Sequence, residues 1–404
     1  MSRCLATFSG RWTPDDRAGT VWPELPFEVP QDCQGLHIEL EFERRAGVLD
    51  LGLIDPLGWL GWSGGSSTVV QIGRDSATPG YLDRGLPAGQ WRVVLGLHRL
   101  PDDGLPFRLE VSTAEVSVAD PLPVPVPKRR PPRQLPTIDG KHWLAGDLHA
   151  HTLHSDGTLT LPELAALGSE NGLDFLAVTD HNTTSHHPYL PGIGERYGLT
   201  LLPGQEVTTA DGHANAFGDI GWIDFRRPAA EWFSQVGERG GLLSINHPLS
   251  GDCAWRHPMA GPPPAAEIWH SSWFDRTWGA PMAWWNVISA LGDTPIPLGG
   301  SDFHRHGQDG EPGAPTTWVL CAENTAEAVL AGLLTGGTAI SAGIDGPLLL
   351  RIGDDLLALQ ADSSMLVCPD GRRSPVHADM VEFADHHGPH VLESNGRVVL
   401  AISS

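Results

Sequence analysis

The stretch Gly146-Asp-Leu-His-Ala-His-Thr-Leu-His-Ser-Asp-Gly157 decides how this chain of 404 residues is interpreted. It continues an apolar run that begins at Leu144, and it carries His149 and His151 two residues apart. Because residues i and i+2 of a strand face the same side, both imidazoles can point at one ligand. His154 and Asp156 follow in the next loop. A lone His-x-His pair is expected by chance about once in such a chain, so the argument depends on the sequence around it.

Outward from this stretch, short apolar runs alternate with helical segments. The apolar runs predict buried strands at residues 144–149, 175–178, 200–203, 242–246, 267–269, 296–299 and 318–320. Helices are predicted at residues 161–170, 229–239, 281–291 and 325–334, the first of them entered through Thr160 as N-cap and Pro162 in the first turn. This alternation predicts an α/β fold with a parallel sheet, closed as a barrel or open.

Side chains that can bind metals gather where the predicted strands end. They are His149, His151, Asp156, His181, Glu206, His213, His247, Asp302 and His304. The loops after parallel strands converge at one edge of the sheet, which is where α/β folds build their active sites. Imidazole and carboxylate together suit Zn, Mn or Fe(II), so the sequence predicts a transition-metal site at this edge.

Cysteines contribute little to this prediction. The five cysteines, Cys4, Cys33, Cys253, Cys321 and Cys368, are widely spaced and form no Cys-x-x-Cys pair. This usage is typical of a reducing compartment, and we expect the thiols to be small buried apolar groups. The sequence therefore argues against a structural zinc knuckle.

Five segments resemble, in order, the motifs of the PHP (polymerase and histidinol phosphatase) superfamily. They are residues 146–157, 175–182, 204–207, 245–248 and 300–304, and residues 212–218 with the β-rich region in front resemble the CehA/McbA-like branch. The resemblance covers about residues 142–341. It implies a distorted (β/α)7 barrel with one to three metal ions, Zn, Mn or Fe, at the carboxyl ends of the strands.

The resemblance also implies how the metal ligands are grouped. His149, His151, Glu206 and Asp302 would hold one metal ion, and Glu206 would bridge it to a second ion held by His213 and His247. Asp156, His181 and His304 match a third site. His213 lies closer to Glu206 in the sequence than in many members of the family.

The regions outside the barrel are expected to be β-rich. Residues 1–120 alternate apolar and polar side chains and predict an N-terminal β-sandwich-like domain. Residues 121–141 form a Pro-rich linker, whose basic triplet Lys128-Arg129-Arg130 we expect to be solvated. The PHP domain then spans residues 142–342, and a small β-rich C-terminal tail spans residues 343–404. In this tail, His386, His387 and His390 are expected to be exposed to solvent.

Charge and hydropathy limit the classes of partner. The chain has 49 acidic and 26 basic residues, for a formal net charge of −23, which disfavours tight binding to duplex nucleic acid. No apolar run approaches the roughly 20 residues that span a bilayer. We therefore expect a cytoplasmic protein that acts on a small molecule without a membrane, and the sequence leaves its oligomeric state open.

The predicted cluster suits hydrolysis of a small phosphomonoester, such as a nucleotide. Metal ions lower the pKa of bound water and neutralise the charge of a transferring phosphoryl group. Glu206, Asp302 and His304 are the expected catalytic residues at the metals. Arg305, or alternatively Arg256, could clamp the phosphate, and His154 or His270 could protonate the leaving oxygen.

Further interpretations stay open. The same cluster could hydrolyse a carbamate, ester or amide bond, or the chain could be a non-catalytic PHP-fold binding module. The tryptophans between residues 250 and 286 could stack on a substrate ring or simply pack in the core. They are Trp255, Trp269, Trp273, Trp278, Trp284 and Trp285.

Overall fold

The structure is a computed structural model, and it describes residues 2–119, 121–271, 279–307, 310–384 and 386–403. The chain forms two compact units, which are described separately. The first unit comprises residues 1–122 together with two later loops, residues 152–158 and 180–188. The second unit comprises residues 123–151, 159–179 and 189–404. Of the tryptophans named above, Trp273 and Trp278 lie outside the described residues.

The first unit contains two antiparallel four-stranded sheets. One sheet has the order β1 (Cys4–Trp12), β8 (Leu105–Thr113), β3 (Gly35–Phe42) and β6 (Val69–Gly73). The other has the order β2 (Glu24–Val29), β7 (Gly89–Arg99), β4 (Val48–Asp55) and β5 (Gly58–Trp62). The helix α1 (Pro14–Gly19) and the short helix η1 (Gly64–Ser66) connect strands.

Alternation of side chains explains why these strands form. In β3, Leu36, Ile38 and Leu40 are buried, whereas Glu39 and Glu41 between and after them are exposed. Strands of both sheets contribute side chains to a single buried cluster. A continuous apolar layer of this kind holds the two sheets together through the hydrophobic effect.

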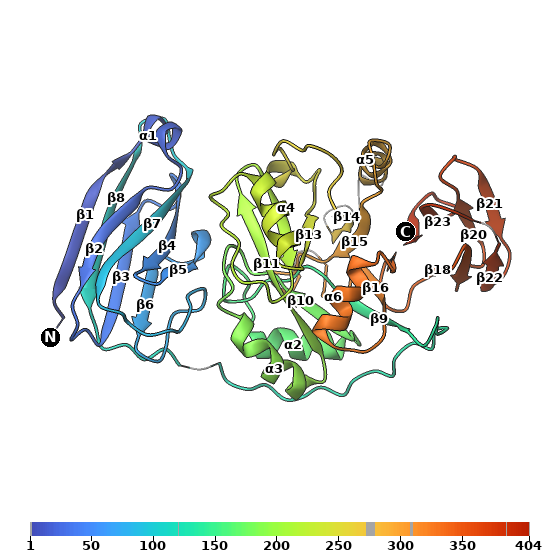
Figure 1. Cartoon of the computed structure of the whole chain (residues 1–404), viewed down its shortest axis with the longest axis horizontal. Helices are drawn as coiled ribbons and strands as arrows, with labels where there is room; N and C mark the ends of the chain where they lie inside the picture. Colours follow the sequence, from blue (N-terminus) through green and yellow to red (C-terminus); the bar gives the residue numbers. More distant parts are fainter. Residues whose placement is uncertain (1, 120, 272–278, 308–309, 385, 404) are drawn as a thin grey trace. The chain divides into compact units, whose positions relative to one another are not determined.

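The second unit is organised around a sheet of 13 strands (Figure 1). The order is β15 (Ile296–Gly300), β14 (Ala265–His270), β13 (Leu242–Ile245), β12 (Gly212–Phe217), β11 (Thr200–Thr209), β10 (Phe175–Val178), β9 (His142–Asp147) and β16 (Thr316–Cys321), followed by β17 (Thr338–Ser341), β24 (Val399–Ser403), β23 (His390–Ser394), β20 (Ser364–Val367) and β21 (Arg373–Val376). A separate three-stranded sheet contains β18 (Leu348–Ile352), β19 (Asp355–Leu359) and β22 (Met380–Phe383).

Helices lie between the strands of the large sheet. They are α2 (Leu161–Glu170), α3 (Leu190–Tyr197), α4 (Ala229–Glu238), α5 (Gly279–Ser289) and α6 (Ala326–Leu334), with short helices η2 (His187–Tyr189) and η3 (Gly251–Cys253) (Figure 1). A capping box of Thr160 and Glu163 begins α2, as its sequence predicts. Among the described residues, no helix has the length and apolarity that crossing a membrane requires.

The sheet is mixed, which departs from the purely parallel sheet that the alternation predicts. Strands β9, β10 and β11 are parallel to each other, as are β13, β14 and β15. Between these groups, β12 pairs antiparallel with both neighbours. The sequence did not predict β12, because its apolar residues are few and it follows β11 through a tight turn. The fold is therefore a mixed α/β fold.

The chain segments after β9 and β15 lie side by side. Ala150 and Phe303 form a parallel bridge, and the amide of His151 donates to the carbonyl of Phe303 at 2.9 Å. The buried carboxylate of Asp147 accepts from the amide of Ser301 at 3.0 Å, which fixes the same junction. The sheet therefore curls until the carboxyl ends of its first and last parallel strands meet.

Within the linker, Lys128 and Arg130 are exposed, as expected for the basic triplet, but Arg129 is half-buried. The Arg129 guanidinium donates to the carbonyls of Gly198 and Leu173, at 3.0 Å each, and pairs with Asp174. The amide of Val124 donates to the Tyr197 hydroxyl at 3.2 Å. These contacts exist because carbonyls at helix ends and turns leave acceptors that a nearby arginine can satisfy.

The histidines of the C-terminal tail are not all exposed. His387 is exposed, as expected, but only 2 % of His390 is accessible to solvent. The expectation for His390 is wrong because this residue begins β23, where strand pairing with β24 turns its side chain inward. Among the cysteines, Cys4 is exposed, whereas Cys33, Cys321 and Cys368 are buried as expected.

Candidate metal centre

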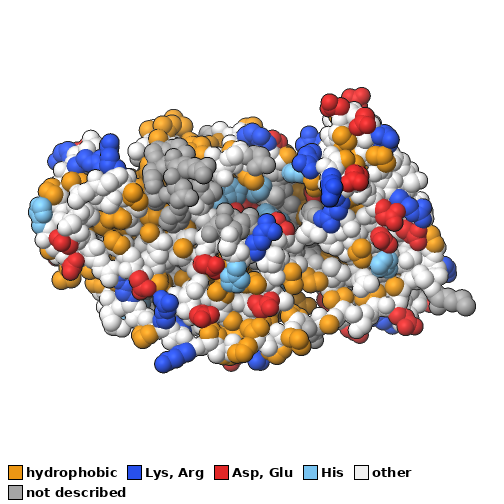
Figure 2. All heavy atoms as spheres, turned by 180° about the vertical axis from the view of Figure 1, so that it is seen from behind, with side chains coloured by type: hydrophobic (Ala, Val, Ile, Leu, Met, Phe, Trp, Pro, Cys, Tyr) orange, Lys and Arg blue, Asp and Glu red, His pale blue; other side chains and the backbone are white. Residues whose placement is uncertain are grey.

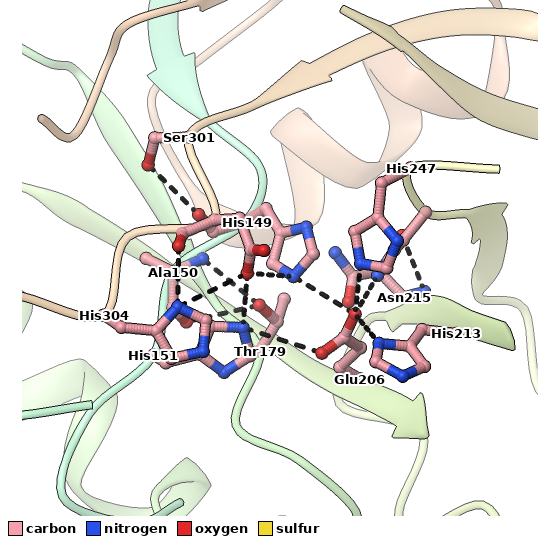
Figure 3. Close-up of polar contacts among 12 residues, drawn as sticks. His149, Ala150, His151, Thr179, Glu206, His213, Asn215, His247, Ser301 and His304 are labelled. Carbon is pink, nitrogen blue, oxygen red and sulfur yellow. Dashed lines mark hydrogen bonds and ion pairs between the residues drawn. The ribbon is translucent and has the colours of Figure 1, made fainter. Parts of the chain in front are cut away.

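Side chains from four strands, or from the turns that follow them, meet at the curled edge of the large sheet. His149 and His151 follow β9, Glu206 lies in β11, His247 follows β13, and Asp302 follows β15. Figure 3 shows Glu206 between a group containing His149 and His151 and a group containing His213 and His247. The arrangement brings together side chains that are up to 153 residues apart in the sequence, between His149 and Asp302.

The first group centres on one oxygen of Asp302. Asp302 Oδ1 lies 3.1 Å from His149 Nε2 and 3.0 Å from His151 Nε2. The same two nitrogens lie 3.3 Å and 3.6 Å, respectively, from the two oxygens of Glu206. Two imidazole nitrogens and two carboxylates therefore face one point, which is the ligand set that a transition metal prefers.

The second group centres on the other side of the same glutamate. Glu206 Oε1 lies 3.2 Å from His213 Nδ1 and 3.4 Å from His247 Nε2. His213 reaches Glu206 because the hairpin of β11 and β12 folds back after Thr209, placing Thr208 opposite His213. This hairpin explains why His213 lies so close to Glu206 in the sequence. Glu206 is the one carboxylate shared by both groups.

His149 shows that the cluster fits a cation. Its Nδ1 lies 2.7 Å from Glu267 Oε1, and since a carboxylate only accepts, Nδ1 carries the hydrogen. The lone pair of the neutral ring is then on Nε2, which is buried and points at the oxygens of Glu206 and Asp302. Three electron-rich atoms this close are stable only around a proton or a metal ion.

The electrostatics of the cluster also favour a positive charge. Burial opposes protonation of His149, but the carboxylates of Asp302, Glu267 and Glu206 outweigh burial and raise the pKa of this imidazole well above its usual value. Burial likewise opposes ionisation of Asp302, but His149 and its neighbours hold the pKa of this carboxyl well below its usual value. Both shifts favour an ionised Asp302 beside a positively charged group.

Backbone conformation at the centre is strained. Asp302 has φ of 52° and His247 has φ of 26°, both in the left-handed region that residues with a Cβ rarely adopt. Such strain persists only where surrounding contacts impose it, and it clusters at functional sites. Both residues lie in the turn after a strand. At each, the strained backbone directs a side chain that can bind a metal toward Glu206 or His149.

Glu267, which the sequence analysis did not name, and His270, which it named only as a possible proton donor, both face the centre. His270 Nε2 lies 3.3 Å from Asp302 Oδ2, and Glu267 accepts from both His149 and the amide of His247. The two residues are three apart in β14, so strict alternation would place them on opposite faces. The register shifts between Glu267 and Trp269, and this irregularity lets both side chains face the centre. A glutamate inside an apolar strand was the available signal.

Asp156 and His181 lie on the two loops that belong to the first unit. Asp156 Oδ1 lies 3.5 Å from His181 Nε2. Burial raises the pKa of Asp50, on β4 of the same unit, to about 7, with His181 opposing the shift and Asp156 adding to it. The carboxyl groups of Asp50 and Asp156 thus form one titratable cluster with the imidazole of His181 within this unit. Its link to the N-terminal strands could not be predicted from the sequence.

The structure places the other residues predicted to act in catalysis in different environments. His304 stacks on His151 with ring centres 4.2 Å apart, and its Nδ1 donates to the Asp302 carbonyl at 2.7 Å. His154 lies in the first unit, where its Nδ1 is 2.7 Å from Ser185 Oγ, and burial lowers its pKa. Arg305 is exposed beside His304. The Arg256 guanidinium instead contacts the turn between β11 and β12, pairing with Asp211 at 3.4 Å.

The tryptophans of this region that the structure describes pack in the hydrophobic core. Trp269 and Trp285 are buried and belong to one hydrophobic cluster, and Trp255 and Trp284 pack against it. At the centre, the side chain of Asp302 is 20 % exposed, whereas those of His149, His151 and Glu206 are buried. In the space-filling view, histidine side chains gather in a hollow near the middle of the visible face (Figure 2).

Comparisons with known proteins find short matches. No family model matches the chain. The chain is 35% identical over 65 residues to a phosphoribosyl 1,2-cyclic phosphate 1,2-diphosphodiesterase of Eggerthella lenta, covering 16% of this chain and 25% of that protein. It is 43% identical over 73 residues to a 5'-3' exoribonuclease of Salmonella typhimurium, covering 18% of this chain and 25% of that protein. The matches span about a quarter of the length of each relative.

Solved structures show distant likeness. A two-domain protein from Bacteroides vulgatus that contains a predicted PHP-like metal-dependent phosphoesterase has a TM-score of 0.43 and 16% identity, over 69% of this chain and 91% of that chain. An amidohydrolase from Chromobacterium violaceum with bound sulfate has a TM-score of 0.32 and 16% identity, over 41% of this chain and 89% of that chain. The likeness to known proteins consists of the ordered motifs, the ligand cluster that they build and the two local sequence matches. In these motifs and in this cluster, the chain resembles the PHP superfamily.

Proposed function

We propose that the protein is a metal-dependent phosphoesterase that hydrolyses a small phosphomonoester, such as a nucleotide. The observation that carries the proposal is the position of Glu206, which lies within 3.4 Å of His149, His213 and His247. One carboxylate shared by two groups of imidazoles suits a pair of adjacent cations. The two curated relatives support a phosphoester in general, because one is named a diphosphodiesterase and the other an exoribonuclease, and the choice of a monoester is part of the proposal.

The proposal assigns the ligands as the family resemblance implies. His149, His151, Glu206 and Asp302 would hold one metal ion, and Glu206, His213 and His247 a second. Asp156, His181 and His304 would supply a third site. Bound divalent ions of this type, Zn, Mn or Fe, would activate water as hydroxide and offset the negative charge of the phosphoryl group.

Other residues would position the ligands and move protons. Glu267 holds the His149 ring by accepting at Nδ1, and the Asn246 amide donates to Glu206 Oε1 at 2.7 Å, which fixes the shared carboxylate. We assign protonation of the leaving oxygen to His270, beside Asp302, in preference to His154, whose Nδ1 is engaged by Ser185.

The proposal extends to the fold and cellular context. Residues 142–342 would form a distorted (β/α)7 barrel of the CehA/McbA-like type, with a sandwich-like domain at residues 1–120, a linker at 121–141 and an extension at 343–404. Arg305 would bind the substrate phosphate from its exposed position beside His304. We further propose that the protein acts in the cytoplasm.

The test is a comparison of bond classes with one enzyme preparation. Metal is removed with a chelator and then Zn, Mn or Fe(II) is restored, and p-nitrophenyl phosphate, bis-p-nitrophenyl phosphate, nucleotides and aryl carbamates or amides are offered. We expect hydrolysis of phosphoesters that depends on the added metal. Hydrolysis of carbamates or amides without any phosphoester would overturn the proposed bond class. Metal binding without turnover of any substrate would support a binding module instead.

A further inference from the structure

A second group of metal-ligand side chains lies in the C-terminal tail, away from the residues of the centre. The Cys368 thiol sulfur and one ring nitrogen each of His386 and His390 lie within 4.8 Å of one another. Cys368 follows β20, His386 lies in the loop after β22, and His390 begins β23. Cys368 and His390 are 8 % and 2 % exposed, so two of the three groups are enclosed.

The two imidazoles are oriented as metal ligands are. His386 Nδ1 lies 2.7 Å from the Ala384 carbonyl oxygen, and His390 Nδ1 lies 2.8 Å from the Gly388 carbonyl oxygen. Because a carbonyl only accepts, each Nδ1 must carry the hydrogen, and each Nε2 keeps its lone pair. Histidines that ligate metals are held in this way, with the second ring nitrogen donating to a carbonyl or carboxylate.

The segments that carry the three side chains are themselves fixed. The amide of Cys368 donates to the Arg372 carbonyl at 2.9 Å, and the amide of Gly371 donates back to the Cys368 carbonyl at 2.9 Å, closing the turn between β20 and β21. The Arg351 guanidinium donates to the carbonyls of His386 and Gly388. These bonds pre-position the ligands before any ion arrives, which lowers the entropic cost of binding.

The Cys368 thiol can supply a sulfur ligand to the site. Among the described residues, the Cys368 sulfur makes no hydrogen bond, so binding a cation would cost it no existing partner. One thiolate and two imidazoles suit Zn²⁺, whose tetrahedral sites often combine them.

We propose that Cys368, His386 and His390 form a structural site for a thiophilic divalent ion, Zn²⁺ in the first place, with water as fourth ligand. On binding, the Cys368 thiol releases its proton to solvent and a sulfur–metal bond forms. The ion would join the β20–β21 turn to the start of β23. Strands β20 and β21 have four residues each, so a metal link would add stability that such short strands lack. The cysteine spacing in the sequence had argued against a structural zinc knuckle.

The test uses Co²⁺ as a spectroscopic substitute for Zn²⁺ in the full-length protein. A thiolate bound to Co²⁺ gives a charge-transfer absorption in the near ultraviolet, and none of the ligands assigned to the catalytic centre is a cysteine. We expect this absorption in the wild type and in the control Cys253→Ser, and its loss in Cys368→Ser. Absence of the band from the wild type, or its persistence in Cys368→Ser, would overturn the proposal.

Two further measurements guard against a variant that fails to fold. In the wild type, Zn²⁺ should slow alkylation of Cys368 by about tenfold or more, as resolved by peptide mass, while exposed Cys4 reacts as before. His386→Asn, at the most exposed of the three ligands, should abolish this protection and retain the circular dichroism of the wild type. Equal alkylation of Cys368 with and without Zn²⁺ in the wild type would refute the site. Hydrolytic activity is not a readout here, so failure of this site leaves the proposed function standing.

Discussion

His149 is held by contacts from several directions at once. Its Nδ1 is fixed by Glu267, its Nε2 faces Glu206 and Asp302, and its Cβ packs against the backbone of Gly300. A Cβ added at Gly300 would lie 2.5 Å from His149 Cβ and 2.6 Å from Glu267 Oε1. Because the packing is this close, a single methyl group added at Gly300 would displace a ligand.

Gly300→Ala is therefore expected to weaken metal binding. The added methyl group must push His149 or Glu267 from its place, and loss of such an orienting contact reduces metal affinity by about tenfold or more. Competition with a chromophoric chelator measures the affinity. The control is Gly192→Ala in α3, where an added Cβ meets nothing within 4 Å. Wild-type affinity in Gly300→Ala would show that His149 is not a ligand.

Metal binding is also expected to release protons. The neighbouring carboxylates raise the pKa of His149 well above its usual value despite its burial, so the metal-free ring is protonated at neutral pH. A metal ion must displace this proton, and its affinity must therefore fall as the pH falls. Titration calorimetry in two buffers of different ionisation enthalpy should give different heats. Identical heats, with an affinity that does not change with pH, would contradict the assignment.

At the scale of helices and strands, the first residues of α2 determine where this helix begins. Thr160 Oγ1 accepts from the amide of Glu163, and Glu163 accepts from the amide of Thr160 at 2.8 Å. The buried side chains Leu161, Leu164 and Ala165 then lie on one face of the helix. The N-cap therefore fixes where the helix after the first histidine motif begins.

Thr160→Ala should lower the free energy of unfolding by about 1 kcal/mol, the usual contribution of an N-cap. Denaturant unfolding of the metal-free protein measures this change. Thr160→Ser keeps the accepting oxygen and should stay close to the wild type. An equal loss in both variants would mean that the methyl group of Thr160, and not its cap, stabilises the helix.

The sequence predicted well those helices and strands whose apolar side chains follow a regular period. The helix at 161–170 and the strand at 175–178 have the same bounds in the structure, because capping residues and a short apolar run mark their ends. Strand β12 was missed, as was the side-chain direction of Glu267 and His270. Both depend on local departures from periodicity, a hairpin and a register shift, which arise from pairing with distant strands.

At the scale of the whole molecule, the linker stabilises the second unit. Arg129 is 34 % exposed and pairs with Asp174, whose side chain is 14 % exposed, whereas its neighbour Arg130 is 63 % exposed and pairs with exposed Asp345. The first pair is partly shielded from water and the second is not. Shielded pairs contribute more to stability than exposed ones.

Arg129→Gln should therefore release the linker, and Arg130→Gln should not. Loss of about 1 kcal/mol at Arg129 corresponds to a several-fold rise in the local opening that exposes the linker to proteases. The rate of cleavage between residues 121 and 136 by a protease of broad specificity measures this opening. Equal cleavage rates in the two variants would show that the linker contacts do not hold in solution.

Long-range organisation was the least predictable level. The loops at residues 152–158 and 180–188 belong to the same unit as residues 1–122, although they lie between strands of the large sheet. The Thr183 hydroxyl donates to the Gly80 carbonyl at 2.7 Å, a bond across 103 residues. No periodicity in the sequence reports such a contact. The candidate ligand residues could be named from the sequence because their chemistry, and not their packing, singles them out.

Glu206 is the residue on which the proposed function depends most directly. The decisive measurement is the rate of phosphoester hydrolysis as metal is restored to metal-free wild type, Glu206→Gln and the control Glu323→Gln at an exposed loop position. Glutamine keeps the volume of Glu206 but removes the charge shared by the two imidazole groups. The rate should rise with added metal in the wild type and control, and should be lower by roughly a hundredfold or more in Glu206→Gln. Equal turnover by Glu206→Gln and the wild type, at equal metal content, would contradict the account.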